Sequence, residues 1–372
     1  MRRQIPILRG LAILAVVCNH AASRGFIAMF WWVHRYRQVT PPNYDQVGTL
    51  PYYGLVVIEQ LAQFSVPAFL FISGFFIAYA ARGNRSTLSW KIIRARITNL
   101  LWPYIIWSIV IHISELLEGQ LLGNNKGYSL AEFFRRLAIG GVARPYFFVP
   151  LLCQFYLLSP IIARYGRAKS TLLLVFSALI QLTITGLLYL RLFGMALPDG
   201  FDTSSWVFAW FAFYFPLGTV CGFHYKRVMQ WLTRLKWELF IAVVVLGASS
   251  ILESEVLYRS TQYSNWARGG FKLSTFLYSV TFILFFLTLD VGSMPFARAI
   301  DQIGSRSYGI YLLHTKVQDF VAKITYHAVP WLLSQQILYQ PVLVVSSVGI
   351  LLLFMAGVAK SPARKFYRYL FG

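Results

Sequence analysis

Charged residues are scarce in this sequence of 372 residues: they make up 13% of it, and Asp and Glu account for only 13 positions. A soluble domain carries about 25% charged residues, so a chain with half that share cannot cover a water-facing surface. Hydrophobic residues reach 57% and aromatic residues 17%, as in proteins that line two membrane interfaces. The composition excludes a disordered chain, a coiled coil and a soluble domain, and it predicts an integral membrane protein.

Cysteine is also rare, with Cys18, Cys153 and Cys221 as the three examples. Each falls within an apolar run, so none is placed for a secreted disulfide, and they are too far apart for a zinc knuckle. We interpret them as small apolar core residues. Phosphate-binding, dinucleotide-binding, zinc-protease and nucleophile-elbow motifs are missing as well. We therefore expect no metal site and no bound cofactor.

Ten apolar runs are candidates for membrane-spanning helices, which need about 20 mostly apolar residues. Proline and glycine cluster in or beside the gaps between them. The sequence predicts an all-α, polytopic membrane bundle of about ten transmembrane helices, organised as one membrane domain over residues 1–372 with no appended soluble domain. The predicted spans are residues 7–23, 55–80, 93–114, 146–163, 170–190, 206–223, 238–252, 271–289, 307–327 and 336–358.

The net charge of +21 is distributed unequally between the two sides of this predicted bundle. If the N-terminus is cytoplasmic, the inner side holds 21 of the 34 Lys and Arg residues and the outer loops hold 11, while Lys316 and Lys323 fall inside the ninth span. The positive-inside rule then predicts that both termini are cytoplasmic. Anionic membrane lipids are the expected partners of these cations, and no nucleic-acid partner is expected.

Two ionisable residues stand out in the first span because charge at membrane depth is costly and often functional. Arg9 and His20 are eleven residues apart, so a helix projects both from one face with an axial separation of about 16 Å. A cation near the cytoplasmic mouth and a titratable imidazole deeper in would suit an anionic substrate that enters from the cytoplasm. Alternatively, Arg9 reaches the inner headgroups and His20 is a hydrogen-bonded bundle residue.

Two further spans carry ionisable groups. Glu59 lies near the outer end of the second span, where it could orient the His20 imidazole or be a solvated interface residue. In the ninth span, Asp319 can pair within its own helix with Lys316 and Lys323. His314 has no such local partner and lies about 12 Å above Arg306, near mid-membrane.

A basic cluster follows the second span. Lys91, Arg94 and Arg96 lie where the phosphates of a cytosolic ligand could dock, although the positive-inside rule also explains most of this cluster. An aromatic stretch after the first span could stack on a sugar or could belong to an interfacial aromatic belt. Its members are Phe26, Met29, Phe30, Trp31, Trp32, His34 and Tyr36.

Four stretches in order resemble the motifs of the acyltransferase-3 family of integral membrane acyltransferases. Residues 9–20 carry an Arg-Gly pair with ten residues between the Arg and a His, and residues 66–75 read VPAFLFISGF. Residues 146–160 resemble the family's third motif with Tyr146 in place of Trp, and residues 303–314 read IGSRSYGIYLLH. The resemblance covers nearly the whole chain.

One element departs from the family pattern. The family often has two arginines three residues apart before a Pro-Tyr pair, whereas this chain has Arg96 and Asn99 before Pro103. Asn99 therefore replaces the second arginine, and Arg94 could substitute for it in contacting phosphate.

The resemblance implies an enzyme with an acyl-CoA donor, usually acetyl-CoA, on the cytoplasmic side, where the donor is a substrate and not a bound cofactor. The acceptor would be a hydroxyl of a cell-surface glycan or its lipid-linked precursor, and the location a bacterial inner membrane. His20 is implied as the catalytic residue and Arg9 as its companion. The other expected substrate contacts are Lys91, Arg94, Arg96, Ser73, Glu59, Tyr156 and His314.

Several alternatives remain open from the sequence alone. A neutral His20 could take the proton of the attacking hydroxyl or carry the acyl group itself. A proton-coupled transporter or flippase of a polysaccharide precursor would also bury His, Lys and Asp in such a bundle. A non-catalytic subunit of a polysaccharide assembly machine is the third reading.

Overall fold

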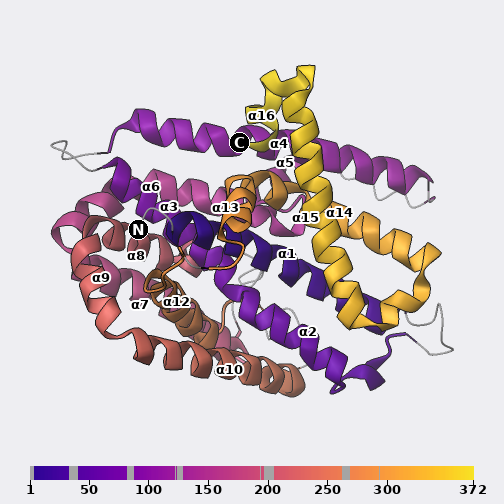
Figure 1. The fold of residues 1–372 in the computed structure, drawn as a ribbon, viewed down its shortest axis with the longest axis horizontal. Coiled ribbons are helices and arrows are strands. Elements are labelled where there is room, and N and C mark those ends of the chain that lie inside the picture. Colours follow the sequence, from indigo (N-terminus) through magenta and orange to yellow (C-terminus); the bar gives the residue numbers. More distant parts are fainter. Residues whose placement is uncertain are drawn as a thin grey trace. The chain divides into compact units, whose positions relative to one another are not determined.

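The chain is all-helical throughout the part that the structure describes. In this computed structural model the described residues are 4–32, 41–81, 88–121, 123, 129–192, 194–196, 205–261, 269–292 and 294–372. The chain divides into two compact units, whose helices are labelled in Figure 1. The first unit comprises Met1–Phe69 and Met229–Gly357, and the second comprises Leu70–Val228 and Val358–Gly372.

Seven helical segments in the described part are long and apolar enough to cross a membrane, so the chain is a multi-pass membrane protein. A further apolar helix, α12 (Leu273–Leu287), is shorter. The total of about ten spans and the cytoplasmic termini stay predictions. The seven segments are Gln4–Trp31, Leu50–Ala80, Trp90–Leu121, Arg144–Ala168, Ser170–Leu192, Lys236–Thr261 and Gln336–Lys360.

Two predicted spans differ from the observed helices. Residues 206–223 do not form one helix: a short 3-10 turn, η6 (Phe208–Phe211), precedes the ten-residue helix α8 (Tyr214–Phe223). The ninth span is helical as α14 (Ser307–Ala328), but it carries Lys316, Asp319 and Lys323 and is not among the apolar segments. The limits of α14 agree closely with the predicted span, and its Asp319 is balanced by protein cations and not by lipid.

The first unit is built around α1 (Gln4–Trp31), which packs against α2, α13 and α14 (Figure 1). In the same unit α10 packs against both α2 and α12. The remaining helices of this unit are α2 (Leu50–Leu61), α10 (Lys236–Thr261), α13 (Ala297–Ser305) and most of α15 (Gln336–Lys360), with the 3-10 turns η2 (Tyr44–Gln46), η3 (Ala62–Phe64) and η7 (Pro330–Ser334).

The second unit packs α6 (Phe148–Ala168) against α4 (Trp90–Leu121), α7 (Ser170–Leu192) and α8. The C-terminal helix α16 (Tyr367–Phe371) packs on α4, where Trp107 donates a hydrogen bond to the Leu370 carbonyl at 2.7 Å. This unit also contains most of α3 (Ser65–Ala80) together with η4 (Arg144–Phe147) and η8 (Pro362–Phe366), and α9 (Tyr225–Arg234) crosses the boundary between the units.

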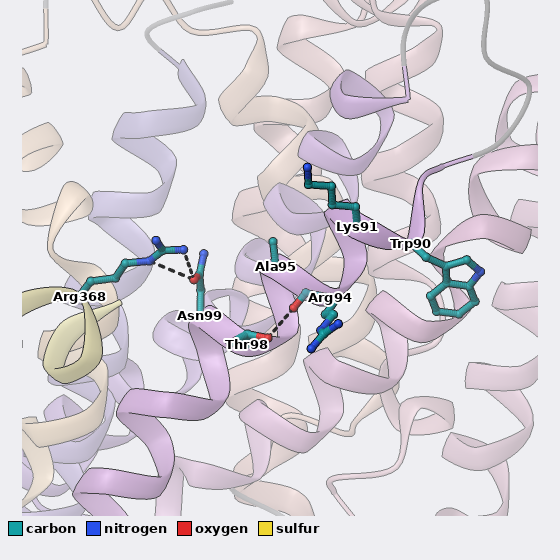
Figure 2. Close-up of a pocket in the computed structure, with 7 residues that line it drawn as sticks. All are labelled: Trp90, Lys91, Arg94, Ala95, Thr98, Asn99 and Arg368. Atoms are coloured by element: carbon teal, nitrogen blue, oxygen red, sulfur yellow. Dashed lines mark hydrogen bonds between the residues drawn. The ribbon is translucent and has the colours of Figure 1, made fainter.

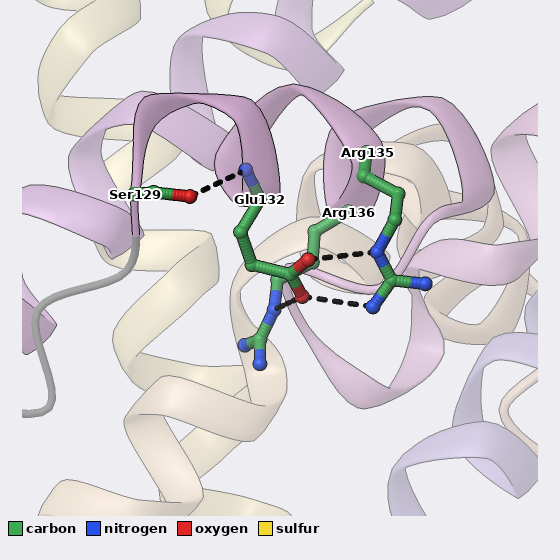
Figure 3. Close-up of polar contacts among 4 residues, drawn as sticks. All are labelled: Ser129, Glu132, Arg135 and Arg136. Atoms are coloured by element: carbon green, nitrogen blue, oxygen red, sulfur yellow. Dashed lines mark hydrogen bonds and ion pairs between the residues drawn. The ribbon is translucent and has the colours of Figure 1, made fainter.

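The predicted outer loop 115–145 contains a short amphipathic helix, α5 (Leu130–Ile139). Ser129 caps its N-terminus by accepting a hydrogen bond from the Glu132 N–H (Figure 3). Gly140 ends the helix in the left-handed conformation. The Glu132 carboxylate accepts two hydrogen bonds from Arg135 and one from Arg136. These bonds, that of Arg135 foremost, lower the pKa of Glu132 to about 2 because they favour its charged form.

The aromatic stretch at the end of α1 belongs largely to the packed core. Phe26, Met29 and Phe30 are buried in a cluster formed with α2, so they cannot stack on a sugar. Trp31 is 50% exposed, and Trp32 contacts Tyr326 of α14 with ring centroids 5.1 Å apart. His34 and Tyr36 lie outside the described residues. Among the described members of this stretch, the two tryptophans are the ones left for a stacking platform.

Candidate active site

Two histidines predicted near mid-membrane meet in the first unit. His20 on α1 and His314 on α14 have ring centroids 5.0 Å apart, with their planes inclined by 52°. His314 is 0% exposed, whereas His20 is only partly buried. One imidazole of the pair is therefore enclosed by protein and the other is open on one side.

Hydrogen bonds determine the tautomer of His314. Its Nδ1 lies 3.1 Å from the Ile310 carbonyl and 2.8 Å from the Tyr311 carbonyl, both in its own helix. Carbonyl oxygens only accept, so Nδ1 carries the hydrogen and Nε2 bears the lone pair. Nε2 is buried and meets no hydrogen-bond donor among the described residues. Leaving such an acceptor unsatisfied costs about 1–3 kcal/mol, which is why this atom is a candidate for contact with a substrate.

Two side-chain contacts hold α14 against α1 beside the histidine pair. The Gln318 side chain, one turn beyond His314, donates to the Val17 carbonyl of α1 at 2.9 Å. Farther along, Arg24 forms an ion pair with Asp319 at 3.0 Å. The predicted pair between Asp319 and Lys323 is also present, at 3.6 Å. The sequence analysis did not find the shorter pair with Arg24, because Arg24 follows the predicted first span and was assigned to a loop.

Arg9 lies on the same continuous helix as His20, as their spacing requires. Asp301 of α13 is the acidic neighbour of Arg9. The Arg9 Nε is buried without a hydrogen-bond acceptor in the described part of the chain. The adjacent Gly10 allows α13 to approach, because a Cβ there would collide with the Ile300 carbonyl. Gly304 is equally confined, since its Cβ would lie 2.8 Å from the Gly10 nitrogen. Small residues permit such close helix contacts, and these two belong to the first and fourth motifs.

Glu59 is buried, at 8% exposure, and is not a solvated interface residue. Its backbone carbonyl accepts a hydrogen bond from Asn19 at 3.1 Å, so the residue beside His20 connects α1 to the end of α2. Glu59 is thus buried beside the turn of α1 that carries His20. Its contact with a substrate stays a prediction.

A buried lysine that the sequence analysis did not single out lies next to this region. Lys272, at 0% exposure, donates from Nζ to Gln60 Oε1 at 2.7 Å and to the Gly269 carbonyl at 3.0 Å. Ser250 on α10 also donates to Gln60 Oε1, at 3.3 Å. The cluster joins α2, α10 and the start of α12. Lys272 was counted as an outer-loop cation although it lies at the start of the predicted span 271–289, and this position at the helix boundary was the one available signal.

In the second unit a basic pocket of about 530 Å³ lies on the first turns of α4 (Figure 2). Its lining contains three cationic side chains and no carboxylate. Lys91 and Arg94 are the two cations predicted there, and the third is Arg368 from α16. The lining residues are Trp90, Lys91, Arg94, Ala95, Thr98, Asn99 and Arg368.

Arg368 lies beside Asn99, the position at which this chain lacks the second arginine of the family pattern. Its Nε and Nη2 donate to Asn99 Oδ1 at 3.2 and 2.6 Å, as Figure 2 shows. The side chain that replaces arginine in the sequence therefore binds an arginine from another helix. Arg94 is also in this pocket, as predicted.

The other predicted residues of the second unit lie apart from this lining. The Arg96 guanidinium is over the ring of buried Tyr156, at 5.7 Å from its centroid, and forms a cation–π contact. Ser73 on α3 is partly buried and precedes Gly74, where a Cβ would collide with the Phe215 carbonyl of α8. The structure thus groups His20, His314, Arg9 and Glu59 in one unit and the remaining predicted residues in the other.

The comparisons identify the class of protein. The chain belongs to the acyltransferase-3 family, whose acyltransferase domain it matches over residues 2–356. A Staphylococcus aureus protein named as a poly-beta-1,6-N-acetyl-D-glucosamine export protein is 23% identical to it, over 70% of this chain and 71% of that protein.

A Bacillus subtilis protein named as a membrane-bound acyltransferase, YfiQ, is 27% identical to this chain, over 68% of each protein. No solved structure matches the chain. This chain is therefore a membrane protein of the acyltransferase class.

Proposed function

We propose that the protein is an O-acyltransferase that moves an acetyl or other short acyl group from cytoplasmic acyl-CoA to a hydroxyl of a cell-surface glycan or its lipid-linked precursor. The observation that carries the proposal is the pair of imidazoles, His20 and His314, held together inside a chain of this family. In the proposal His20 is the catalytic residue, and Arg9 supports it from the same helix. The enzyme works in a bacterial inner membrane.

The chemistry of His20 fits this proposal. A neutral imidazole can attack a thioester carbonyl or accept the proton of an alcohol, and a partly exposed ring is within reach of substrates. Glu59, Ser73 and Tyr156 are the further proposed substrate contacts. A bound metal or cofactor has no part in this scheme, because both reactants bring their own reactive groups.

The basic pocket supports a donor that carries phosphate groups. Lys91, Arg94 and Arg368 surround it without a compensating carboxylate, and arginine forms strong, charge-assisted hydrogen bonds to phosphate. The exposed indole of Trp90 at its edge offers a face on which a nucleobase can stack. In the proposal these groups bind the nucleotide end of acyl-CoA, and Arg96 contributes from its place over Tyr156.

The experiment is a transfer assay on the purified protein. Radiolabelled acetyl-CoA is supplied with a panel of acceptors: N-acetylglucosamine oligomers, neutral hexose oligomers and a polyprenyl-linked amino sugar. Label transfer that disappears in His20→Ala and in Arg9→Ala is the expected result. Transfer that persists unchanged in His20→Ala would overturn the assignment of the catalytic residue.

A second candidate function is export of a polysaccharide or its precursor, since the Staphylococcus aureus relative is named for export. Ion pairs and a buried lysine inside a helical bundle also occur in carriers. Proteoliposomes loaded with a labelled sugar oligomer separate the two functions. Sugar movement without acyl transfer would favour export, and acyl transfer without movement would favour the enzyme.

A further inference from the structure

We propose that His314 is the base that takes the proton from the acceptor hydroxyl, which leaves His20 to carry the acyl group. This inference rests on the proposed function and extends it from one imidazole to two with separate tasks. It concerns the first unit only, where both rings belong to helices that contact each other.

The orientation of His314 carries the argument. Its Nδ1–H is directed at two carbonyls of its own helix, so the ring cannot turn over without losing those bonds. Nε2 is then the acceptor, and it is fully buried with no donor in the described chain. A substrate hydroxyl is a donor of the kind that this atom lacks.

The position of the ring is equally constrained. The Gln318 bond to Val17 and the ion pair between Arg24 and Asp319 bind α14 to α1 beside the two histidines. His314 therefore faces His20 in a fixed arrangement, as a base must if proton removal is to coincide with attack. Of the two rings, His20 is the more accessible. This suits the role of nucleophile, because the nucleophile must contact the thioester of the donor.

The two steps balance in atoms and charge. First, the unprotonated nitrogen of His20 attacks the thioester carbonyl, the C–N bond forms, the C–S bond breaks and a thiolate leaves, so His20 becomes an acylimidazolium. Second, the alcohol oxygen bonds to the acyl carbon while its proton passes to Nε2 of His314. The C–N bond breaks and its electron pair returns to His20. The protonated His314 finally gives its proton to the thiolate, and both imidazoles are neutral again.

The variant His314→Asn isolates this role, because an asparagine amide can still donate to the Ile310 and Tyr311 carbonyls whereas Nε2 is gone. Purified full-length protein is given labelled acetyl-CoA with either the best sugar acceptor of the panel or hydroxylamine. Hydroxylamine is a strong nucleophile that needs no base to remove a proton. We expect sugar transfer to fall about 100-fold or more, while the rate with hydroxylamine stays close to that of the wild type.

Three controls make the outcome decisive. His327→Asn, at the exposed end of the same helix, should leave both rates unchanged, and His20→Ala should abolish both. His314→Gln, which can accept a hydrogen bond but cannot take a proton, should repeat the pattern of His314→Asn.

Equal loss of both rates in the two His314 variants would show a structural role and overturn the inference, as would no loss in either. If the wild type transfers label to neither acceptor, the proposed function fails, and this inference fails with it. Loss of the sugar rate alone supports the inference.

Discussion

His20 and His314 are chemically alike but differ in their surroundings. One ring is partly open, and the other is buried with one nitrogen bonded to its own helix. Sequence reasoning identified both as imidazoles near mid-membrane. It could not predict that they touch, because α1 and α14 are distant in the chain and no spacing rule relates them. The bond between Arg368 and Asn99 escaped prediction for the same reason.

The rate of acyl transfer should depend on pH through His20. An ordinary histidine has a pKa of about 6.5, and His20 attacks the thioester in its neutral form. Transfer should therefore rise between about pH 5 and 8. The initial rate with saturating acetyl-CoA measures this, and a flat profile would contradict the account.

The buried Lys272 should be energetically coupled to Gln60. Replacing either residue removes the hydrogen bond that the two share in a buried site, so the second replacement should cost less than the first. We expect Lys272→Met and Gln60→Leu each to lower thermal stability in detergent. The double variant should recover about 0.5–3 kcal/mol of the summed loss. Additive losses would show that the two side chains do not depend on each other.

At the scale of helices, lipid-facing segments were the most predictable. Three predicted spans lie within observed helices: 93–114 in α4, 170–190 in α7 and 336–358 in α15. Their own side chains are apolar on most sides, because little of each helix is buried in the protein. Breaks inside the bundle were missed. The 3-10 turn η3 interrupts the second predicted span, and the turn η6 precedes α8 within the sixth. Tertiary contacts determine such breaks, and they leave no sign in hydrophobicity.

The close contact of α1 with α13 should not tolerate a side chain at Gly10. Gly10→Ala places a methyl group against the Ile300 carbonyl, and overpacking of this kind costs about 1–3 kcal/mol. Gly349→Ala, in α15, is the matched control, because a Cβ there has no neighbour within 4 Å. That control should be neutral or slightly stabilising. Thermal unfolding in detergent compares the two variants, and equal effects would refute the close contact.

The short helix α16 should contribute to donor binding although it follows the part of the chain that matches the family. Arg368→Ala removes one of three cations from an exposed pocket. We expect the KM for acetyl-CoA to rise about fivefold, equivalent to about 1 kcal/mol, while kcat stays unchanged. Arg364→Ala, an exposed arginine outside the lining, should have no effect. A change in kcat alone would assign Arg368 another role.

For the whole molecule, composition was enough to predict an all-helical membrane protein, and the motifs were enough to predict its family. The number of spans was less accessible, because α8 and α12 are short and α14 is polar. Such helices depend on neighbouring helices to satisfy the hydrogen bonds of their polar side chains and terminal backbone groups. A count based on hydrophobic runs treats them as independent, and it placed the start of α8 too early.

The orientation of the chain in the membrane can be tested with cysteine probes. In a chain freed of its three cysteines, Leu130→Cys on α5 should react with an impermeant maleimide in intact cells, because its loop is predicted to be outside. Lys365→Cys, near the C-terminus, should react only after permeabilisation, as the positive-inside rule requires. Both positions are exposed. The reverse pattern would contradict a cytoplasmic C-terminus.

The central claim is that an imidazole on α1 receives an acyl group from a coenzyme A thioester. The most direct measurement is rapid acid quenching of purified protein mixed with labelled acetyl-CoA, followed by mass spectrometry of the peptide that contains His20. The account predicts label on His20, in greater amount in His314→Asn than in the wild type because removal of the acyl group is slowed. Unlabelled His20 in both proteins, while sugar transfer proceeds, would contradict it.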